Sequence, residues 1–245
     1  MRSLGVRSVA CVIGGSLGGM QTLEWAATAG ATFVKSIITI CCGTHHHAWQ
    51  IAISAAQRQA IYADPNWNGG DYAKGKEPRA GLSVARQMAM VSYRSHEAYE
   101  AKFGRKVAKK KPAQEHGQLT HYDVEGYLRY QGEKFFSRFD ALSYVKLTRT
   151  MDTHDLGRGR GGVQAACTNL LTMPALVVGV SSDALYPPSE QRDLMALLPK
   201  GEVLMIESPN GHDGFLLDYK IMQPTAIAFL QRQQAQRPTF IASRL

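Results

Sequence analysis

The chain has 245 residues, of which 44% are hydrophobic and 20% are charged, a composition typical of one globular domain and not of disordered, collagen-like or coiled-coil chains. The longest apolar runs, at residues 9–13 and 175–180, are far shorter than the roughly 18 residues that a membrane helix needs. The net charge of +8 comes mostly from residues 102–111, which carry six basic groups and no acidic one, so that 22 basic and 20 acidic groups remain elsewhere.

The sequence also indicates the cellular compartment and the binding partners to expect. No signal-type apolar region follows Met1, so we expect a cytoplasmic protein. The four cysteines show no CxxC spacing, so we expect reduced thiols and no zinc site. The basic segment is interpreted as a solvated loop or helix end, with phosphate contact to an anionic substrate or a polynucleotide as the alternative. Phe103 is its only aromatic residue, which argues against base stacking, and we expect no nucleic-acid and no membrane partner.

Strands and helices alternate at the start of the chain. An apolar run at residues 9–13 predicts a strand, and apolar spacing after a glycine-rich turn predicts a helix over residues 20–29. The pattern repeats as a strand at residues 34–42 and a helix over residues 48–62. We therefore expect residues 1–75 to form one half of an α/β core.

The middle of the chain, residues 76–165, is predicted to be a helical lid insertion. Apolar positions at helical spacing mark helices over residues 82–103, 124–139 and 141–151. A glycine-rich stretch at residues 157–162 then breaks the helical pattern.

The last part, residues 166–245, is predicted to complete the core. Short apolar runs at residues 175–180 and 203–206, bounded by Pro and Gly, are typical of buried parallel strands, and a helix follows over residues 221–231. This alternation at both ends of the chain predicts an α/β fold with a parallel sheet and a helical lid.

The first chemical signal is a G-x-S-x-G motif centred on Ser16, between a predicted strand and a predicted helix. In a nucleophile elbow the serine occupies a strained turn, and the helix N-terminus faces the reacting oxygen. A glycine-rich phosphate cradle is the competing interpretation, but the motif lacks the Lys-Ser/Thr of a P-loop and the G-x-G-x-x-G spacing. A plain glycine turn is the remaining alternative.

A serine nucleophile needs an acid and a histidine, which follow it in that order in this type of fold. Asp183 follows the run at residues 175–180, and His212 follows the run at residues 203–206. Both therefore lie at carboxyl ends of predicted strands, where parallel sheets gather their ligands. Three other acids compete for the role of the triad acid, but two do not follow a strand and the third is adjacent to His212: Asp152, Asp155 and Asp213.

Residues 45–47 are three consecutive histidines. Adjacent residues on an extended loop cannot all face one ion, and no HExxH or carboxylate ligand pattern lies nearby. We interpret them as loop residues near the pocket and expect no metal site.

The chain closely resembles the homoserine O-acetyltransferase family of the α/β-hydrolase superfamily. The glycine-rich elbow Gly-Gly-Ser-Leu-Gly-Gly-Met-Gln and the segment His-Asp-Gly-Phe-Leu are specific to that family and its serine-acylating relatives. The resemblance spans essentially the whole chain and rests on residues 14–21, 23–25, 48–49, 57–61, 64–65, 93–95, 103–106, 124–128, 182–188 and 211–216.

The resemblance implies a function and a set of residues. It implies Ser16 as nucleophile, Asp183 as acid and His212 as base, with the Leu17 N–H as an oxyanion donor. It further implies that three residues hold the amino-acid substrate: Arg86, Tyr93 and Asp213. An arginine fork suits the carboxylate of homoserine and a carboxylate suits its ammonium. The implied activity is acetyl transfer from acetyl-CoA, a co-substrate, to L-homoserine in methionine biosynthesis, with no cofactor and with a homodimer through the lid.

One departure from the family pattern concerns the sheet. A complete α/β-hydrolase has several strands before the elbow, and a loop after one of them donates a second N–H to the oxyanion hole, whereas a single strand precedes Ser16. We therefore expect N-terminal strands to be missing, as in an incomplete gene product, a fragment or a degenerate relative. The elbow strand would lie at a sheet edge, and we expect little or no turnover from this chain, since losing one oxyanion donor costs about 10²–10³ in rate.

Three functions remain open on the sequence. The first is the acyltransferase, the second is an ester hydrolase with the same triad, and the third is an inactive relative that acts only through a partner. Whether consumption of acetyl-CoA depends on homoserine separates the first two.

Overall fold

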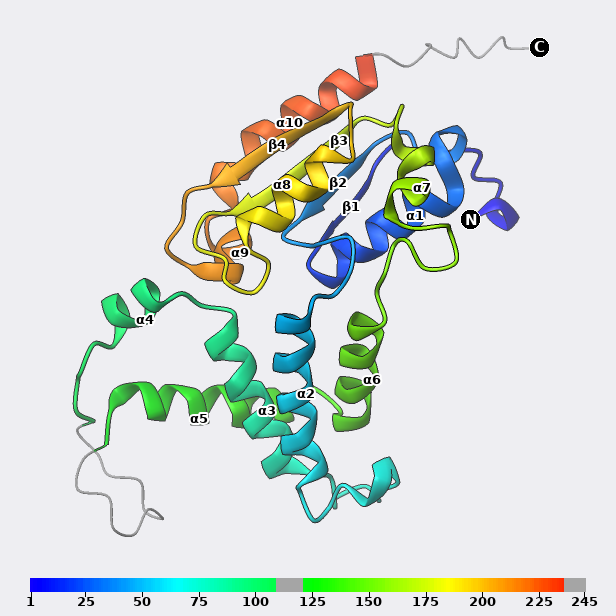
Figure 1. The fold of residues 1–245 in the computed structure, drawn as a ribbon. Coiled ribbons are helices and arrows are strands. Elements are labelled where there is room, and N and C mark those ends of the chain that lie inside the picture. The colour runs from blue at the N-terminus through cyan, green and yellow to red at the C-terminus, as the bar shows by residue number, and fades with distance from the viewer. Residues whose placement is uncertain (109–120, 236–245) are drawn as a thin grey trace.

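A parallel sheet of four strands forms the centre of the protein (Figure 1). The computed structural model describes residues 1–108 and 121–235. The strands are β1 (Val12–Gly15), β2 (Ile37–Ile40), β3 (Ala175–Val180) and β4 (Gly201–Ile206), in the order β1-β2-β3-β4. The predicted α/β fold with a parallel sheet is therefore confirmed.

The first strand starts and ends later than the sequence predicted. Val9 pairs with Val34 only as an isolated bridge, and the ladder with β2 runs on to the pair Gly15 and Ile40. The glycines predicted as a turn thus belong to the strand, because two residues without side chains still pair through their backbone. The chain turns only at Ser16.

Helices cover both faces of the sheet. One face is covered by α1 (Leu17–Phe33) and α8 (Pro188–Ala196), with α7 (Val163–Cys167) beside α1, and the other by α9 (Gly214–Leu217) and α10 (Tyr219–Ala235) (Figure 1). Side chains of β3 alternate between the two apolar cores, since Val177 packs on the α1 side whereas Leu176 and Val178 pack on the α10 side. All six residues of β3 are buried, as expected for a strand between two helical layers.

A helical layer lies beyond the carboxyl ends of the strands (Figure 1). It contains α2 (Ala48–Tyr62), α3 (Arg79–Ser92), α4 (His96–Lys102), α5 (Asp123–Phe136) and α6 (Ala141–Asp152). These helices have an apolar cluster of their own, which includes Ile61, Leu82, Phe135 and Tyr144. Because α2 packs against α3 and α6, the layer includes a helix that the sequence assigned to the first part of the core.

The helix predicted over residues 82–103 is wrong in one respect, because the structure divides it. Helix α3 ends at Ser92, and α4 begins after Ser95, whose Oγ accepts a hydrogen bond from the Ala98 N–H at 3.0 Å. A serine that caps a new helix competes with continuation of the old one. Short 3₁₀ turns complete the described structure: η1 (Arg2–Leu4), η2 (Asn68–Gly70), η3 (Thr168–Leu170) and η4 (Gly211–Asp213).

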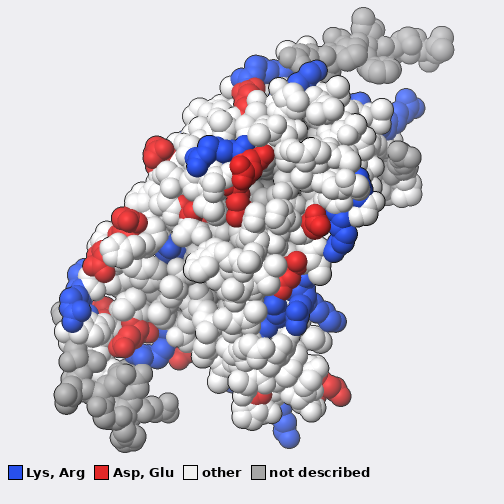
Figure 2. Space-filling model, in the orientation of Figure 1, with Lys and Arg blue, Asp and Glu red and all other residues white. Residues whose placement is uncertain are grey.

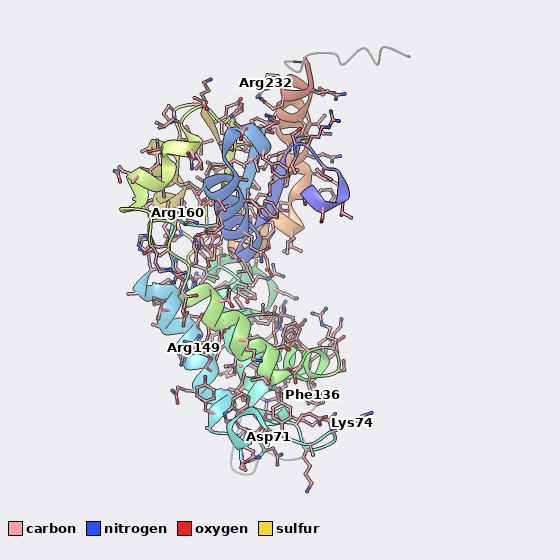
Figure 3. The ribbon with its side chains drawn as sticks, turned by 90° about the vertical axis from the view of Figure 1, so that its right-hand side faces the viewer. Asp71, Lys74, Phe136, Arg149, Arg160 and Arg232 are labelled. Atoms are coloured by element: carbon pink, nitrogen blue, oxygen red, sulfur yellow. The ribbon has the colours of Figure 1, made fainter. Side chains whose placement is uncertain are left out.

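The face of the molecule shown in Figure 2 carries charges of both signs. In the side view, Arg232 lies at the sheet end of the molecule, while Phe136, Lys74 and Asp71 lie at the far end of the helical layer (Figure 3). Residues 109–111 of the basic segment lie outside the described residues. No helix in the part of the chain that the structure describes is long and apolar enough to cross a membrane.

Candidate active site

Ser16 lies at a sharp turn between β1 and α1. Its backbone angles are φ 55° and ψ −121°, a region that non-glycine residues rarely adopt. The turn is held by the Ser16 N–H, which donates to the Ile40 carbonyl at 2.8 Å. A Cβ on Gly14 would lie 2.1 Å from the Gly18 oxygen, so the glycine is needed for the close approach of strand and helix. The predicted strand–turn–helix context of the motif is present.

Asp183 and His212 lie at the carboxyl ends of β3 and β4 and contact each other. Asp183 Oδ2 lies 2.8 Å from His212 Nδ1, and Asp183 Oδ1 accepts hydrogen bonds from the N–H groups of Leu185 and Tyr186, both at 2.8 Å. Both side chains are buried. Since an ionised carboxylate only accepts hydrogen bonds, Nδ1 of His212 carries a proton and Nε2 is the basic nitrogen.

The three rival acids have other partners. Asp152 contacts His46 and Arg58, and Asp155 accepts from the backbone N–H of Gly157. Asp213 lies 3.4 Å from the Nε of Arg94. Asp183 is thus the carboxylate that hydrogen-bonds His212 among the described residues.

Ser16 and His212 border the same group of aromatic rings. Ser16 lines a small cavity together with Tyr93 and Tyr186, and the His212 ring lies 5.9 Å and 5.2 Å from these two rings. Phe215 packs edge-on against His212 at 5.5 Å and also lies beside Gly15, where a Cβ would come 2.8 Å from its ring. Among the described residues no hydrogen bond joins Ser16 Oγ to His212, so this contact stays a prediction.

The Leu17 N–H is available at the elbow. Leu17 is the first residue of α1, and the first N–H groups of a helix have no carbonyl partner within it. The helix N-terminus also carries a partial positive charge. An oxygen that becomes negative above Ser16 would therefore meet a favourable potential.

The proposed substrate residues Arg86, Tyr93 and Asp213 lie close together. The Arg86 guanidinium is 5.6 Å from the Tyr93 ring centre and 4.8 Å from that of Phe135, and its buried Nε has no hydrogen-bond partner among the described residues. The Asp213 N–H donates to the Tyr93 carbonyl at 3.1 Å. An arginine with an unused buried donor is suited to an anion that is not part of the chain.

Arg94 is a charged group of the site that the sequence did not assign a role. Burial raises the pKa of the Asp213 carboxyl. The ion pair with Arg94 lowers that pKa again, as do His212 and Arg86. Arg94 Nη1 donates to Asn210 Oδ1 at 3.1 Å. Arg94 belongs to the segment at residues 93–95 that the family resemblance includes, which was the only signal for it.

Sequence comparison assigns the fold family. The profile of the alpha/beta hydrolase fold family matches residues 1–219. The chain belongs to this family. It is also 49% identical over 221 residues to the homoserine O-acetyltransferase of Salinibacter ruber, a match that covers 89% of this chain and 61% of the relative. The homoserine O-acetyltransferase of Saccharomyces cerevisiae is 36% identical, with 94% and 62% covered.

Solved structures agree on the fold of this α/β-hydrolase. The structure of homoserine O-acetyltransferase from Bacillus anthracis matches with a TM-score of 0.85 at 24% identity, covering 94% of this chain and 62% of that one. Esterase E22 matches with a TM-score of 0.81 at 20% identity, covering 94% and 63%. At these identities the likeness concerns the fold alone. The chain spans about 61% of the length of the first curated relatives it matches.

The cysteine and histidine clusters of the α/β-hydrolase were also considered as metal sites. Cys41 Sγ, Asp183 and His212 place ligand-type atoms within 4.8 Å of one another, but burial raises the pKa of the Cys41 thiol, and both Asp183 oxygens already accept hydrogen bonds. This arrangement favours a protonated thiol over a metal ligand. The three histidines do not face one point: the His45 ring lies 4.0 Å from that of His47, which caps α2, whereas His46 lines the Ser16 cavity.

Proposed function

We propose that this chain carries the active site of an acyltransferase that moves an acetyl group from acetyl-CoA to the hydroxyl of L-homoserine. The observation that carries the proposal is Ser16, a strained serine on a strand–helix elbow, in a chain whose hydrogen-bonded Asp183 and His212 follow β3 and β4. The acceptor is proposed from relatives named homoserine O-acetyltransferase at up to 49% identity.

The first half-reaction acylates the serine. Ser16 Oγ forms a bond to the acetyl carbon of acetyl-CoA while His212 Nε2 takes the hydroxyl proton. The Leu17 N–H and the N-terminus of α1 stabilise the negative oxygen of the tetrahedral intermediate. The carbon–sulfur bond then breaks, and His212 returns the proton to the leaving thiolate. Asp183 keeps the imidazole in the tautomer that these steps need.

The second half-reaction transfers the acetyl group. The homoserine hydroxyl attacks the acyl carbon as His212 takes its proton, and the proton returns to Ser16 Oγ when the ester to the enzyme breaks. Arg86 would hold the acceptor carboxylate, and Asp213 would accept from its ammonium. Tyr93 supports this arrangement, because it contacts Arg86, His212 and Asp213.

The biological setting follows from the proposed reaction. O-acetylhomoserine would enter methionine biosynthesis, and we place the protein in the cytoplasm. A homodimer through the helical layer is supported by exposed apolar residues on two of its helices, Val84 of α3 and Tyr130 of α5, at 43% and 55% exposure.

Thiol release and product formation test the proposal. Purified protein with acetyl-CoA should release CoA faster when L-homoserine is added, and O-acetylhomoserine should form in equal amount. Ser16→Ala should abolish both, whereas Ser137→Ala, an exposed serine at the end of α5, should change neither. Thiol release that is independent of homoserine would indicate the ester hydrolase instead. No covalent labelling of Ser16 by a fluorophosphonate would indicate the inactive relative.

A further inference from the structure

A second histidine, His46, borders the cavity of Ser16. The cavity has a volume of about 30 Å³, which is room for about one water molecule. Ile53 and Ser92 line both this cavity and a groove of about 400 Å³ between α2 and α3. A small substrate that enters through the groove and separates these walls would meet His46 beside the serine.

His46 is fixed by charged groups from two helices. Its Nδ1 lies 3.2 Å from Asp152 Oδ1 at the end of α6, and Asp152 Oδ2 accepts from the Arg58 guanidinium of α2 at 2.5 Å. The His46 N–H donates to the His154 carbonyl at 3.0 Å. His46 is 6% exposed and Arg58 3%. Such a buried and paired arrangement holds the ring in one orientation.

The contacts also fix which nitrogen of His46 carries the proton. An ionised Asp152 can only accept, so Nδ1 is the donor. Burial, together with the charge of Arg58, lowers the pKa of the His46 imidazole in spite of Asp152, so the ring is neutral and Nε2 carries a lone pair. Nε2 makes no hydrogen bond with the described residues, in a side chain that lines the cavity. The cavity therefore contains a fixed acceptor.

The acceptor substrate needs such a group. The proposed ammonium partner, Asp213, is already paired with Arg94 at 3.4 Å, so its charge is shared. An ammonium group has three N–H donors, and each one left unpaired in a buried site is costly. Gln57, in the same cavity, already uses its oxygen to accept from the Tyr144 hydroxyl at 2.8 Å, whereas Nε2 of His46 is not yet used by the described residues.

We propose that His46 is a specificity-determining residue, whose Nε2 accepts a hydrogen bond from the amino group of the acceptor, and that Asp152 and Arg58 are positioning residues that fix its tautomer. The inference rests on the proposed function and deepens it. It makes this site selective for an amino acid over a hydroxy acid of the same length.

Calorimetric titration of the 245-residue chain tests the selectivity. The ligands are L-homoserine and 4-hydroxybutanoate, which lacks only the amino group. The unaltered chain should bind homoserine at least 10-fold more tightly, and His46→Phe, which keeps a planar ring without nitrogens, should lower this ratio about 10-fold. His121→Phe is the matched control, because His121 is buried next to the start of α5 and does not line the cavity. It should leave the ratio unchanged.

Nitrogen-15 NMR of the histidine rings measures the protonation of Nε2 of His46 directly. If His46 were only structural, this signal would not respond to the ligands. The Nε2 signal of His46 should be that of an unprotonated nitrogen and should shift with homoserine but not with 4-hydroxybutanoate. Asp152→Asn offers an amide donor to Nδ1, so it should move the proton to Nε2 and lower the preference for homoserine.

The outcomes separate the inference from the proposed function. An unchanged ratio in His46→Phe, an equal loss of both ligands, or no preference in the unaltered chain overturns the role of His46, even if Ser16 reacts with a fluorophosphonate. Selective loss of homoserine binding without any reaction at Ser16 supports the amino-group site and overturns the acyltransferase.

Discussion

Replacement of Asp183 by Asn should stop the chemistry and leave the fold intact. The side-chain oxygen of Asn can still accept from the N–H groups of Leu185 and Tyr186, which Asp183 now binds at 2.8 Å through one oxygen. The amide NH₂ would then face His212 Nδ1, where the second carboxylate oxygen lies at 2.8 Å. An amide donor forces the His212 proton onto Nε2, and this tautomer cannot take a proton from Ser16.

The size of the effect follows from the geometry. Loss of the basic nitrogen costs roughly 10⁴ in rate in serine triads, which is about 5.4 kcal/mol of barrier. Loss of one hydrogen bond to a charged group costs only about 1.5–3 kcal/mol of stability. The substitution should therefore separate activity from folding.

Two measurements on the same preparations test this. The rate of Ser16 acylation by 4-nitrophenyl acetate should fall by about four orders of magnitude, while the thermal unfolding transition stays cooperative. Asp193→Asn, an exposed acid on α8, is the control and should change neither. Acylation at the unaltered rate in Asp183→Asn would refute the assignment of Asp183 as the orienting acid, and loss of the folded state would refute the view that Asn preserves the loop.

Three further predictions follow from other parts of the structure. Arg86→Ala should raise the KM for homoserine at least 10-fold and leave that for acetyl-CoA unchanged, because only the acceptor has the carboxylate; equal effects in initial-rate kinetics would make Arg86 structural. Gly14→Ala should unfold the elbow, since its Cβ would lie 2.1 Å from the Gly18 oxygen. Gly126→Ala is the control, because its Cβ would meet open space in α5, and it should stabilise the protein by about 0.5–1 kcal/mol. Similar stabilities of the two variants in chemical denaturation would contradict this. Burial raises the pKa of Glu190 to about 7 from 4.5, so between these pH values the folded state binds a proton that the unfolded state has lost. The stability of the protein should therefore fall as the pH rises from 4.5 to 7. Glu190→Gln should remove that fall, and an unchanged pH profile of stability in this variant would exclude Glu190 as its source.

The sequence predicted those features that depend on local pattern. Helix α2 begins and ends at the predicted residues, because its apolar spacing is regular over 15 residues. The three proposed triad residues were selected from a motif and from the rule that parallel strands gather polar loops at one edge. The break between α3 and α4 at residues 93–95 was missed, because the apolar spacing continues across it and Ser95, which caps α4, is the local sign that a new helix begins.

Contacts between side chains far apart in the chain could not be predicted from the sequence. Arg58 and Asp152 are separated by 94 positions and meet only because α2 and α6 pack together. Asp152 was considered only as a rival triad acid, although its partner is a different histidine. Neither residue has a local pattern that distinguishes it from a charge on a solvated helix face.

The missed helix break is also the point at which the helical layer contacts the loop that carries His212. Gly211, at φ 66°, packs so tightly on the break that a Cβ would lie 2.7 Å from the carbonyl carbon of Arg94. The Ser95 hydroxyl donates to the Pro209 carbonyl, and the Asp213 N–H donates to the Tyr93 carbonyl at 3.1 Å. A continuous helix would have used the carbonyl of Tyr93 within itself, so that it could not accept from the loop of His212. In the proposed mechanism, a displacement of α3 would therefore move Arg86 together with the loop of His212, so that binding of the acceptor would be coupled to the position of the proposed base.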